Sequence, residues 1–199
     1  MPSVDATKIH QGPGKLWLSV SVPASGSRLL INSAGDPTAG SPVFAGATEG
    51  AVTVLLSPKL EAVGADQIAA PIDVVMTGEA ASVEVTLKES DLAKLKNYIV
   101  NGPYTSGTDT GLPAGAQAYE EISFGGTMAI PKTSVAVISP RRDASGKFVV
   151  SQLYSAYQAE AIQLPFQRGK ETTYKVKFEG LADPSRAAGD QVGKLYRQT

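Results

Sequence analysis

The residues that could carry out chemistry are few in this chain of 199 amino acids. The chain has one histidine, His10, and no cysteine, which excludes thiol catalysis, thiolate metal sites and disulfides. His10 lies in a polar N-terminal stretch, where no third group would hold an imidazole in the fixed geometry of a catalytic triad or metal site. We therefore expect His10 to be a solvated surface residue and expect no catalytic residue and no enzymatic activity.

Two acidic pairs are the remaining candidates for a catalytic or metal site. Glu120 and Glu121 are adjacent in a predicted strand, so their side chains point to opposite faces and cannot share a site. Asp66 and Asp73 are better placed to converge, but a calcium site needs several oxygen ligands at close spacing, and no dense acidic loop is present. The sequence therefore predicts exposed strand carboxylates, with no metal ion and no cofactor.

Two basic motifs could in principle bind a phosphate group. Residues 12–15 are GPGK, but Ile9 and Leu16 stand where a phosphate-binding loop has glycine and Ser or Thr, so we expect a hinge. Arg141 and Arg142 precede Asp-Ala-Ser-Gly, a sequence typical of a charged hairpin tip. Contact with a phosphate is the alternative role for these arginines.

The composition favours a β-rich domain with many turns. Hydrophobic residues make up 42% of the chain and charged residues only 19%, with Gly, Pro, Ala, Ser and Thr making up the difference. The formal net charge of −1 gives no overall attraction to nucleic acid or to an anionic membrane. The charge is uneven: 51–100 has four basic and seven acidic residues (net −3), and 151–199 has seven basic and five acidic residues (net +2).

Neither a signal peptide nor an apolar run of membrane-spanning length is recognisable in the sequence. We therefore expect a protein that is used in a cytoplasm-like space, or that leaves it without a signal. Within that space, the uneven charge would suit a head-to-tail contact between unlike regions of two copies.

Alternating apolar and polar residues predict most of the secondary structure. The clearest case is 81–87, and the Thr-Gly-Glu sequence at 77–79 predicts a tight turn that joins 72–76 to it as a hairpin. The inward residues are Ala81, Val83, Val85 and Leu87 in that strand, and Leu16, Leu18, Val20 and Val22 in the first one. The predicted strands are 15–22, 28–32, 51–56, 72–76, 81–87, 119–124, 133–139, 148–157, 160–164 and 172–178.

One helix is predicted at about 90–100. Ser90 is its expected N-cap, and an apolar stripe follows at Leu92, Leu95 and Ile99. Such a helix can only cover one face or end of a sheet. The residues that follow, 101–115, show no pattern and predict a long loop of the kind that is functional or disordered.

The chain is predicted to be one domain with two arms. The polar segments 1–14 and 181–199 form the arms, and 15–180 forms the domain. The predicted fold class is mainly β: a β-sandwich or barrel-like domain with one flanking α-helix, long loops, and N- and C-terminal arms.

Three pieces of sequence, in order over residues 12 to about 100, point to a family. GPGKLWL leads into the first strand, and VFAGATEGAVTV (43–54) contains an aromatic residue followed by Gly-x-Thr-x-Gly. Residues 61–99 combine a strand, an Asp-Gln element, a hairpin and a helix in the sequence EAVGADQIAAPIDVVMTGEAASVEVTLKESDLAKLKNYI. Together these pieces resemble the major tail (tail tube) proteins of long-tailed bacteriophages. The later strands match that family in number only.

The resemblance implies a virion structural protein. Six copies would form a ring, rings would stack into the tail tube, and hairpins from all copies would close into one barrel through which genomic DNA passes without specific binding. It also implies tape measure, tail-tip and tail-terminator proteins as partners, with no membrane. The protein would be assembled in the bacterial host cytoplasm and would reside in the virion tail.

Two sets of residues are candidates for roles in such a tube. The candidate lumen-facing residues, which point away from the predicted core, are Asp73, Ser82, Glu84 and Thr86. The candidate inter-ring loop residues are Asn101, Tyr104, Thr108, Asp109 and Leu112. An acidic to neutral lumen would let a DNA duplex pass without sticking.

Two alternatives remain open from the sequence. Another phage ring protein, such as a tail terminator, neck or distal tail protein, would share the fold but form only one ring. A β-sandwich ligand-binding module would need aromatic side chains on an exposed strand face. Trp17, which lies opposite the apolar face of the first strand, leaves that alternative open.

Overall fold

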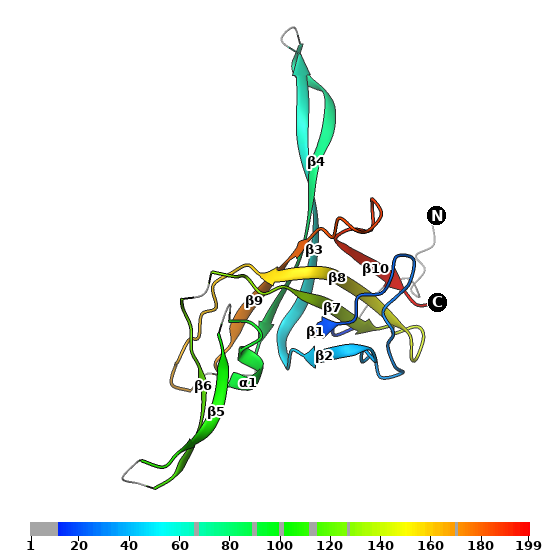
Figure 1. Ribbon diagram of the computed structural model, residues 1–199. Coiled ribbons are helices and arrows are strands. Elements are labelled where there is room, and N and C mark those ends of the chain that lie inside the picture. The colour runs from blue at the N-terminus through cyan, green and yellow to red at the C-terminus, as the bar shows by residue number, and fades with distance from the viewer. Residues whose placement is uncertain are drawn as a thin grey trace.

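The computed structural model describes residues 12–65, 68–88, 91–99, 102–111, 115–126, 128–169 and 171–199. It is mainly β, and its paired strands are antiparallel. The elements in chain order are β1 (Lys15–Val20), β2 (Gly40–Phe44), β3 (Thr48–Ala65), β4 (Ile68–Leu87), α1 (Leu92–Leu95), β5 (Tyr104–Asp109), β6 (Gln117–Ile122), β7 (Thr133–Pro140), β8 (Phe148–Gln158), β9 (Tyr174–Leu181) and β10 (Gly193–Arg197). Figure 1 shows a compact body from which two hairpins project in opposite directions.

Eight of the strands form one sheet, in the order β2-β1-β7-β8-β9-β4-β3 with β10 also paired to β8. One edge of β8 serves two partners in succession, since β10 pairs with its first half and β9 with its last four residues. β5 and β6 pair only with each other. The predicted β-sandwich is therefore a single curled sheet within the described residues.

The core lies inside the curl of this sheet. Apolar residues from β1, β4, β7, β8 and β9 belong to one buried cluster, although β1 and β4 are far apart in the strand order. The residues predicted to face inward on β4, Ala81, Val83, Val85 and Leu87, are all buried at 5% exposed or less. Val176 and Phe178 of β9 are buried beside them.

Helix α1 closes one end of the core but is shorter than predicted. Its N-cap is Asp91, whose carboxylate accepts a hydrogen bond from the Ala93 backbone N–H at 2.9 Å, and not Ser90, which lies outside the described residues. Just after the helix, Tyr98 is 1% exposed and packs against two aromatic rings of β9. The Tyr98 hydroxyl donates to the Ala45 carbonyl at 2.9 Å, so this one buried side chain ties the helical turn to the chain between β2 and β3.

A bulge in β1 places apolar residues on both faces of the sheet. Ser19 has φ +54°, and its backbone N–H donates to the Thr133 hydroxyl at 3.2 Å. Because the bulge shifts the alternation, Val20 joins a second cluster on the other face with Trp17, while Leu18 stays in the main core. The prediction that Val20 shares a face with Leu18 is therefore wrong.

The turn predicted at 77–79 is also wrong. β4 runs without interruption through these residues, and the hairpin reverses between Ala65 and Ile68. Lys59 pairs with Gly78 and Leu60 pairs with Met76, so Thr77 is a bulge residue in a strand of 20 residues. Its hydroxyl donates to the Lys59 carbonyl at 3.4 Å.

Several other boundaries differ from the predictions. The loop predicted at 101–115 contains β5, and the arm predicted at 181–199 contains β10, which pairs with β8 along its whole length. No strand forms at 28–32, where one isolated bridge joins Ile31 to Pro37, or at 160–164. In the N-terminal arm, residues 1–11 lie outside the described residues, and 12–14 lead into β1 without regular structure.

Candidate functional site

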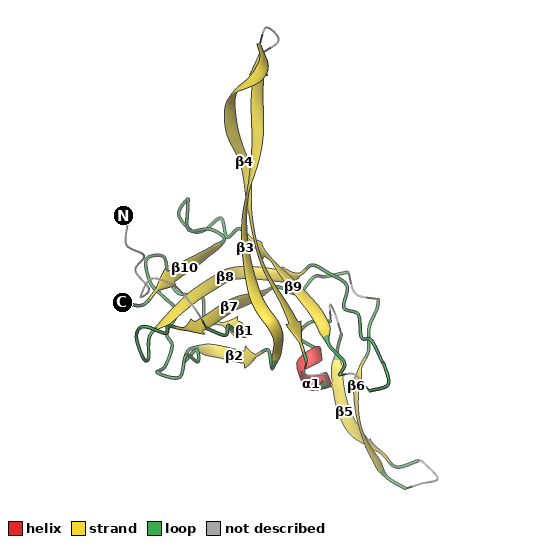
Figure 2. Cartoon of the chain, turned by 180° about the vertical axis from the view of Figure 1, so that it is seen from behind, coloured by secondary structure: helices red, strands yellow, loops and turns green. Residues whose placement is uncertain are grey.

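The β3–β4 hairpin is the most prominent feature of the molecule. Its strands contain 18 and 20 residues, and its far half stands clear of the body (Figures 1 and 2). β9 pairs with β4 only from Ser82 to Leu87, and β3 pairs only with β4, so the far half has free backbone edges on both sides within the described chain. A two-stranded ribbon of this length has little intrinsic stability in water, and free edges invite pairing with another chain.

One face of this ribbon is apolar from the core to the far half. We call it the apolar face, and its apolar members are Val54, Leu56, Pro58, Leu60 and Ala62 on β3 with Ile72, Val74, Met76, Ala81 and Val83 on β4, while Glu79, opposite Pro58, is the one charged residue among them. The members near the body are buried or pack against the core, whereas Leu60 is 62%, Val74 55% and Met76 55% exposed. Nothing in the described chain covers these outer residues.

The opposite face contains the candidate lumen-facing residues. The bulge at Thr77 shifts the alternation by one residue, which puts Asp73 on the same face of β4 as Ser82, Glu84 and Thr86. At about 3.3 Å per residue, Asp73 and Glu84 lie about 35 Å apart along the ribbon. Ser82 points away from the core but is only 6% exposed, so in this structure it lines no open surface.

Glu84 belongs to a network of ion pairs and not to an acidic patch. The Lys175 amine lies 3.2 Å and the Lys177 amine 3.8 Å from its carboxylate. Both lysines also lie 3.7 Å from Glu160, and Lys177 lies 3.3 Å from Glu179. With three carboxylates and two amines, the face of β4 and β9 is close to neutral.

The pKa values in this network follow from its pairing. The hydrogen bond to Glu84 raises the pKa of the Lys175 amine, and the hydrogen bond to Glu179 raises that of Lys177. The Tyr157 hydroxyl donates to Glu179 at 2.9 Å, which is the main cause that lowers the pKa of this carboxyl. Lys175, Lys177 and Glu179 therefore stay ionised at neutral pH.

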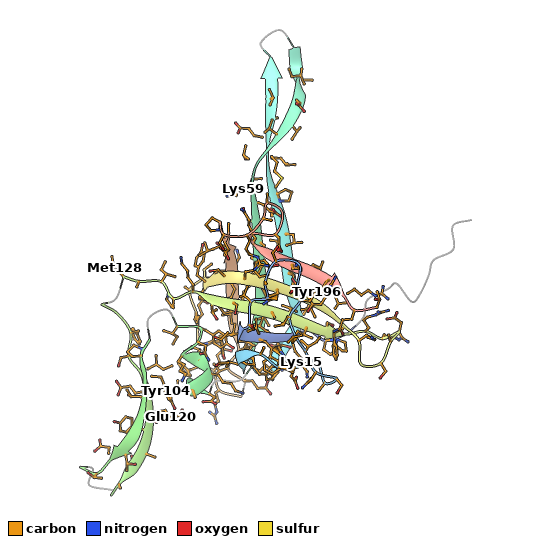
Figure 3. All side chains as sticks on the ribbon, turned by 45° about the vertical axis from the view of Figure 1, so that its right-hand side comes forward. Lys15, Lys59, Tyr104, Glu120, Met128 and Tyr196 are labelled. Atoms are coloured by element: carbon orange, nitrogen blue, oxygen red, sulfur yellow. The ribbon has the colours of Figure 1, made fainter. Side chains whose placement is uncertain are left out.

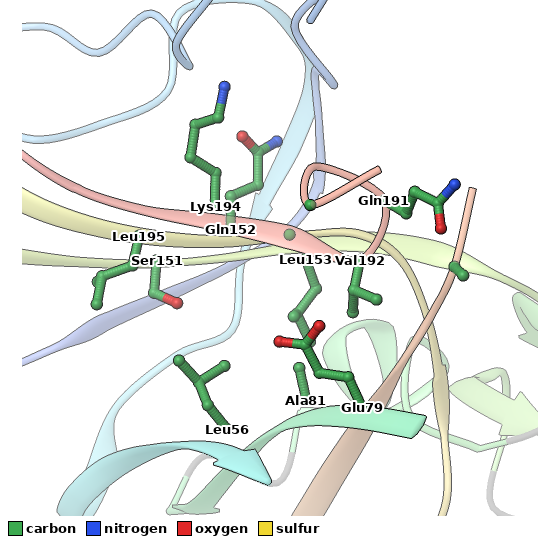
Figure 4. Close-up of a pocket in the computed structure, with 13 residues that line it drawn as sticks. Leu56, Glu79, Ala81, Ser151, Gln152, Leu153, Gln191, Val192, Lys194 and Leu195 are labelled. Carbon is green, nitrogen blue, oxygen red and sulfur yellow. The ribbon is translucent and has the colours of Figure 1, made fainter. Parts of the chain in front are cut away.

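A cavity of about 280 Å³ lies where the apolar face leaves the body (Figure 4). Leu56, Glu79 and Ala81 line one side, and the segment around Val192 and Lys194 lines the other. The lining combines aliphatic side chains with polar ones that include Glu79, Ser151 and Lys194, and no hydrogen bond joins these three side chains within the described residues. The cavity is a recess beside the root of the hairpin.

A polar cluster fixes the segment that covers this cavity. Asp190 accepts hydrogen bonds from the Tyr154 hydroxyl at 2.5 Å and from the Arg186 guanidinium at 3.1 Å, and Arg186 stacks over the Tyr154 ring. The tyrosine hydrogen bond is the largest influence that holds the pKa of Asp190 at about 2. Burial, followed by the nearby carboxylate, raises the pKa of Tyr154 to about 12. The loop before β10 is thus a fixed part of the body.

The candidate inter-ring residues lie on a second projecting hairpin. Tyr104, Thr108 and Asp109 belong to β5, which points away from the body opposite to the β3–β4 hairpin (Figures 1 and 3). The Lys96 amine lies 4.8 Å from the centre of the Tyr104 ring, so this face of the hairpin looks towards α1. Asn101 and Leu112, the other two candidates, lie outside the described residues.

The acidic and basic motifs do not converge into a reaction site. Glu120 and Glu121 pair with Ser106 and Thr105 and so lie on opposite faces of the β5–β6 hairpin, as predicted. The Arg141 side chain binds the Asp143 carboxylate at the tip between β7 and β8, which matches a charged hairpin tip. Residues 12–15 lead into a strand and not into a helix.

His10 and Asp66 lie outside the described residues. Among the described residues, no group of three or more His, Cys, Asp or Glu side chains could hold a metal ion. None of the described helical residues belongs to a segment with the length and hydropathy of a membrane-crossing helix.

The sequence patterns missed how far the apolar face extends. Ile72, Val74 and Met76 share a face, as alternate residues of a strand do, but the alternation could not show that this face lies outside the core. A signal was present, because β3 continues with apolar residues past Leu56 to Leu60 without a turn sequence.

Comparison with known proteins assigns no family. No protein-family model matches the chain, and no curated protein matches it.

Proposed function

We propose that this protein is a virion structural protein that self-assembles into rings, and that stacked rings of six copies form the tail tube of a long-tailed bacteriophage. The observation that carries the proposal is the uncovered apolar face of the β3–β4 hairpin. Five large apolar side chains on this face are 55–62% exposed, namely Leu56, Leu60, Ile72, Val74 and Met76. Such a contiguous surface marks a contact with another molecule.

A second copy of the chain is the partner that best fits this hairpin. The far half offers free edges on β3 and β4, to which strands of neighbouring copies can add by main-chain hydrogen bonds. Closing such strands around a ring removes every edge and leaves a channel. The hairpin thus supplies both the apolar contact and the strand pairing that a closed barrel of many subunits needs.

The shape of the chain favours stacking as well as ring closure. The β3–β4 and β5–β6 hairpins project in opposite directions (Figures 1 and 2). Contacts made by unlike surfaces on opposite ends are head-to-tail, and head-to-tail contacts that do not close on themselves generate a filament. This arrangement supports a tube over a single ring, which a tail terminator, neck or distal tail protein would form.

The channel would carry DNA without binding it. Of the candidate lumen residues, Glu84 is neutralised by two lysines, so a lumen formed by that face would be nearly neutral and not acidic. A balanced surface adds little phosphate attraction, because each amine already has a carboxylate partner. In the tube we expect the chain to contact tape measure, tail-tip and tail-terminator proteins.

Electron microscopy of the purified full-length chain tests the proposal. Negative-stain images should show rings with a central hole at high protein concentration, and tubes that lengthen when a tail-tip complex is added. Rings that never stack would support the single-ring alternative. A strict monomer at all concentrations, with and without the tail-tip complex, would refute self-assembly altogether.

A further inference from the structure

A basic basin lies at the C-terminal end of β10. Arg28, Lys147 and Arg197 line it together with Tyr196 and the last two residues, and its volume is about 520 Å³. Three elements distant in sequence build it: the segment after β1, the turn before β8, and β10 itself. Because the Tyr196 hydroxyl donates to the Leu29 carbonyl at 3.1 Å, β10 is held against the segment that carries Arg28.

The basin has more positive charge than its own carboxylates neutralise. Asp143 is the only acidic residue of the adjoining turn, and it binds both Arg141 and Arg197. These two arginines hold its pKa at about 2, the hydrogen bond from Arg141 being the largest cause. Arg28 and Lys147 are exposed and have no ion pair or hydrogen bond from their side chains within the described chain. Two cations of the basin are therefore available to an anionic partner.

The β5–β6 hairpin has the opposite charge. Residues 102–131 include three carboxylates, Asp109, Glu120 and Glu121, and neither lysine nor arginine. The register puts Asp109, Tyr119 and Glu121 on one face, while Glu120 lies on the face that contains Tyr104 and looks towards α1. We call the first of these the outer face of the hairpin.

The outer face also presents an aromatic ring in a fixed position. Tyr119 is 45% exposed and lies across Gly107, where a Cβ atom would come within 3.0 Å of the tyrosine hydroxyl oxygen. Any larger residue at position 107 would require the ring to shift by a few tenths of an ångström. A tyrosine between two carboxylates suits a partner that offers guanidinium groups, since arginine both pairs with carboxylates and stacks on aromatic rings.

We infer that the basic basin binds the outer face of the β5–β6 hairpin from a second copy of this chain. Asp109 and Glu121 would pair with Arg28 and Lys147, and Tyr119 would lie against the guanidinium of Arg28. The hairpin and β10 lie on opposite sides of the body (Figures 1 and 2), so one chain cannot bring its own two surfaces together. The inference rests on the proposed self-assembly and assigns one of its contacts.

Charge reversal in the full-length chain tests this contact. Glu121→Lys should weaken self-association in sedimentation velocity at least ~10-fold, because it places like charges opposite one another. Glu120→Lys is the matched control, since it makes the same charge change one residue away on the other face. It should change self-association less than ~3-fold, well below the effect of reversing a contact charge.

The basin side has its own variant and control. Arg28→Glu with Lys147→Glu should weaken self-association at least ~10-fold, and more strongly at 0.1 M than at 1 M salt, between which the screening length falls from about 10 Å to about 3 Å. Lys132→Glu with Arg168→Glu makes the same charge change at exposed residues outside the basin. Circular dichroism establishes that all variants are folded.

Mixing the two impaired proteins is the decisive step. A Glu121→Lys chain and an Arg28→Glu, Lys147→Glu chain should associate with each other, because the basin of the first chain and the hairpin of the second are both unchanged and can still form the contact. Two proteins impaired by misfolding would not restore one another. Failure of the mixture to associate, or equal impairment by Glu120→Lys, overturns the inference.

Two further outcomes separate this contact from the other hypotheses. Tubes of normal yield from Glu121→Lys would overturn the contact but leave the tail-tube proposal standing. Association that follows the predicted charges, without rings or tubes in the wild-type protein, would refute the tube and retain the contact. A labelled DNA duplex provides the other outcome. If the duplex binds the wild-type protein but not the Arg28→Glu, Lys147→Glu variant, and the two mixed variants do not associate, the occupant of the basin is nucleic acid and the inference is wrong.

Discussion

Leu60 and Met76 provide the most direct test of the apolar face. They pair across the far half of the β3–β4 hairpin and are 62% and 55% exposed. Complete burial of a Leu or Met side chain contributes about 1.5–3 kcal/mol, so covering the exposed part of both in an assembly should contribute about 2–3.5 kcal/mol. Replacing both by threonine, which keeps a high strand propensity, should weaken each contact by roughly 30- to 300-fold.

This double substitution should hardly change the stability of the folded monomer. Both side chains lie outside the core, so the free energy of unfolding should change by less than about 0.5 kcal/mol per residue. Val63→Thr with Val75→Thr is the matched control, because these residues lie on the opposite face of the same ribbon. It should retain far more assembly than the Leu60 and Met76 variant.

Light scattering or sedimentation against protein concentration measures the effect. The expected result is a shift of the concentration for half-assembly by roughly 30- to 300-fold for the Leu60 and Met76 variant alone. Unchanged assembly, or an equal loss in the control, would show that the apolar face is not a contact surface. A large loss of monomer stability would show instead that these residues serve the fold.

The remaining predictions concern the body of the protein. The pKa of Asp190 in the folded state is about 2, below its ordinary value of 3.8, so the stabilising effect of its carboxylate should be complete above pH 4 and lost as the pH falls towards 2. The free energy of unfolding of Asp190→Asn, measured with urea, should therefore depend less on pH in this range than that of the wild type. Tyr98→Phe should lower the free energy of unfolding by about 1–2 kcal/mol, because the buried Ala45 carbonyl loses its donor; an unchanged value by urea denaturation would refute that assignment. Deleting 193–199 should lower the free energy of unfolding by more than about 2 kcal/mol, through lost strand pairing and burial, whereas a loosely attached arm could be removed without any loss of thermal stability.

The sequence predicted the strands of the body well, because their alternation reflects which side of a sheet each residue occupies. The strands around Val135, Val150 and Val176 occur where predicted, to within a few residues. Most of their buried residues are apolar, with Ser139 and Gln152 as buried polar exceptions. A local pattern is sufficient to predict these strands, because it depends only on whether each face of the strand is buried in the body or exposed to solvent.

The turn predicted at Gly78 shows where local patterns fail. Thr-Gly-Glu fits a tight turn and a β-bulge equally well, because both place an irregular residue between two runs of alternation. The choice depends on β3, whose 18 residues pair with β4 across the bulge. Strand pairing over that distance is a tertiary property, so the sequence around Gly78 could not reveal it.

The same limit applies to β10 and to the candidate surfaces. The residues of β10 alternate weakly and are mostly polar, and they form a strand because β8 offers them an unpaired edge. By itself the sequence determined the fold class, the inward residues of the core strands and the scarcity of reactive side chains. Only the tertiary structure decided that Val74 and Met76 stand outside the core and that Arg28, Lys147 and Arg197 share one basin, because exposure and proximity depend on which distant segments fold against each other.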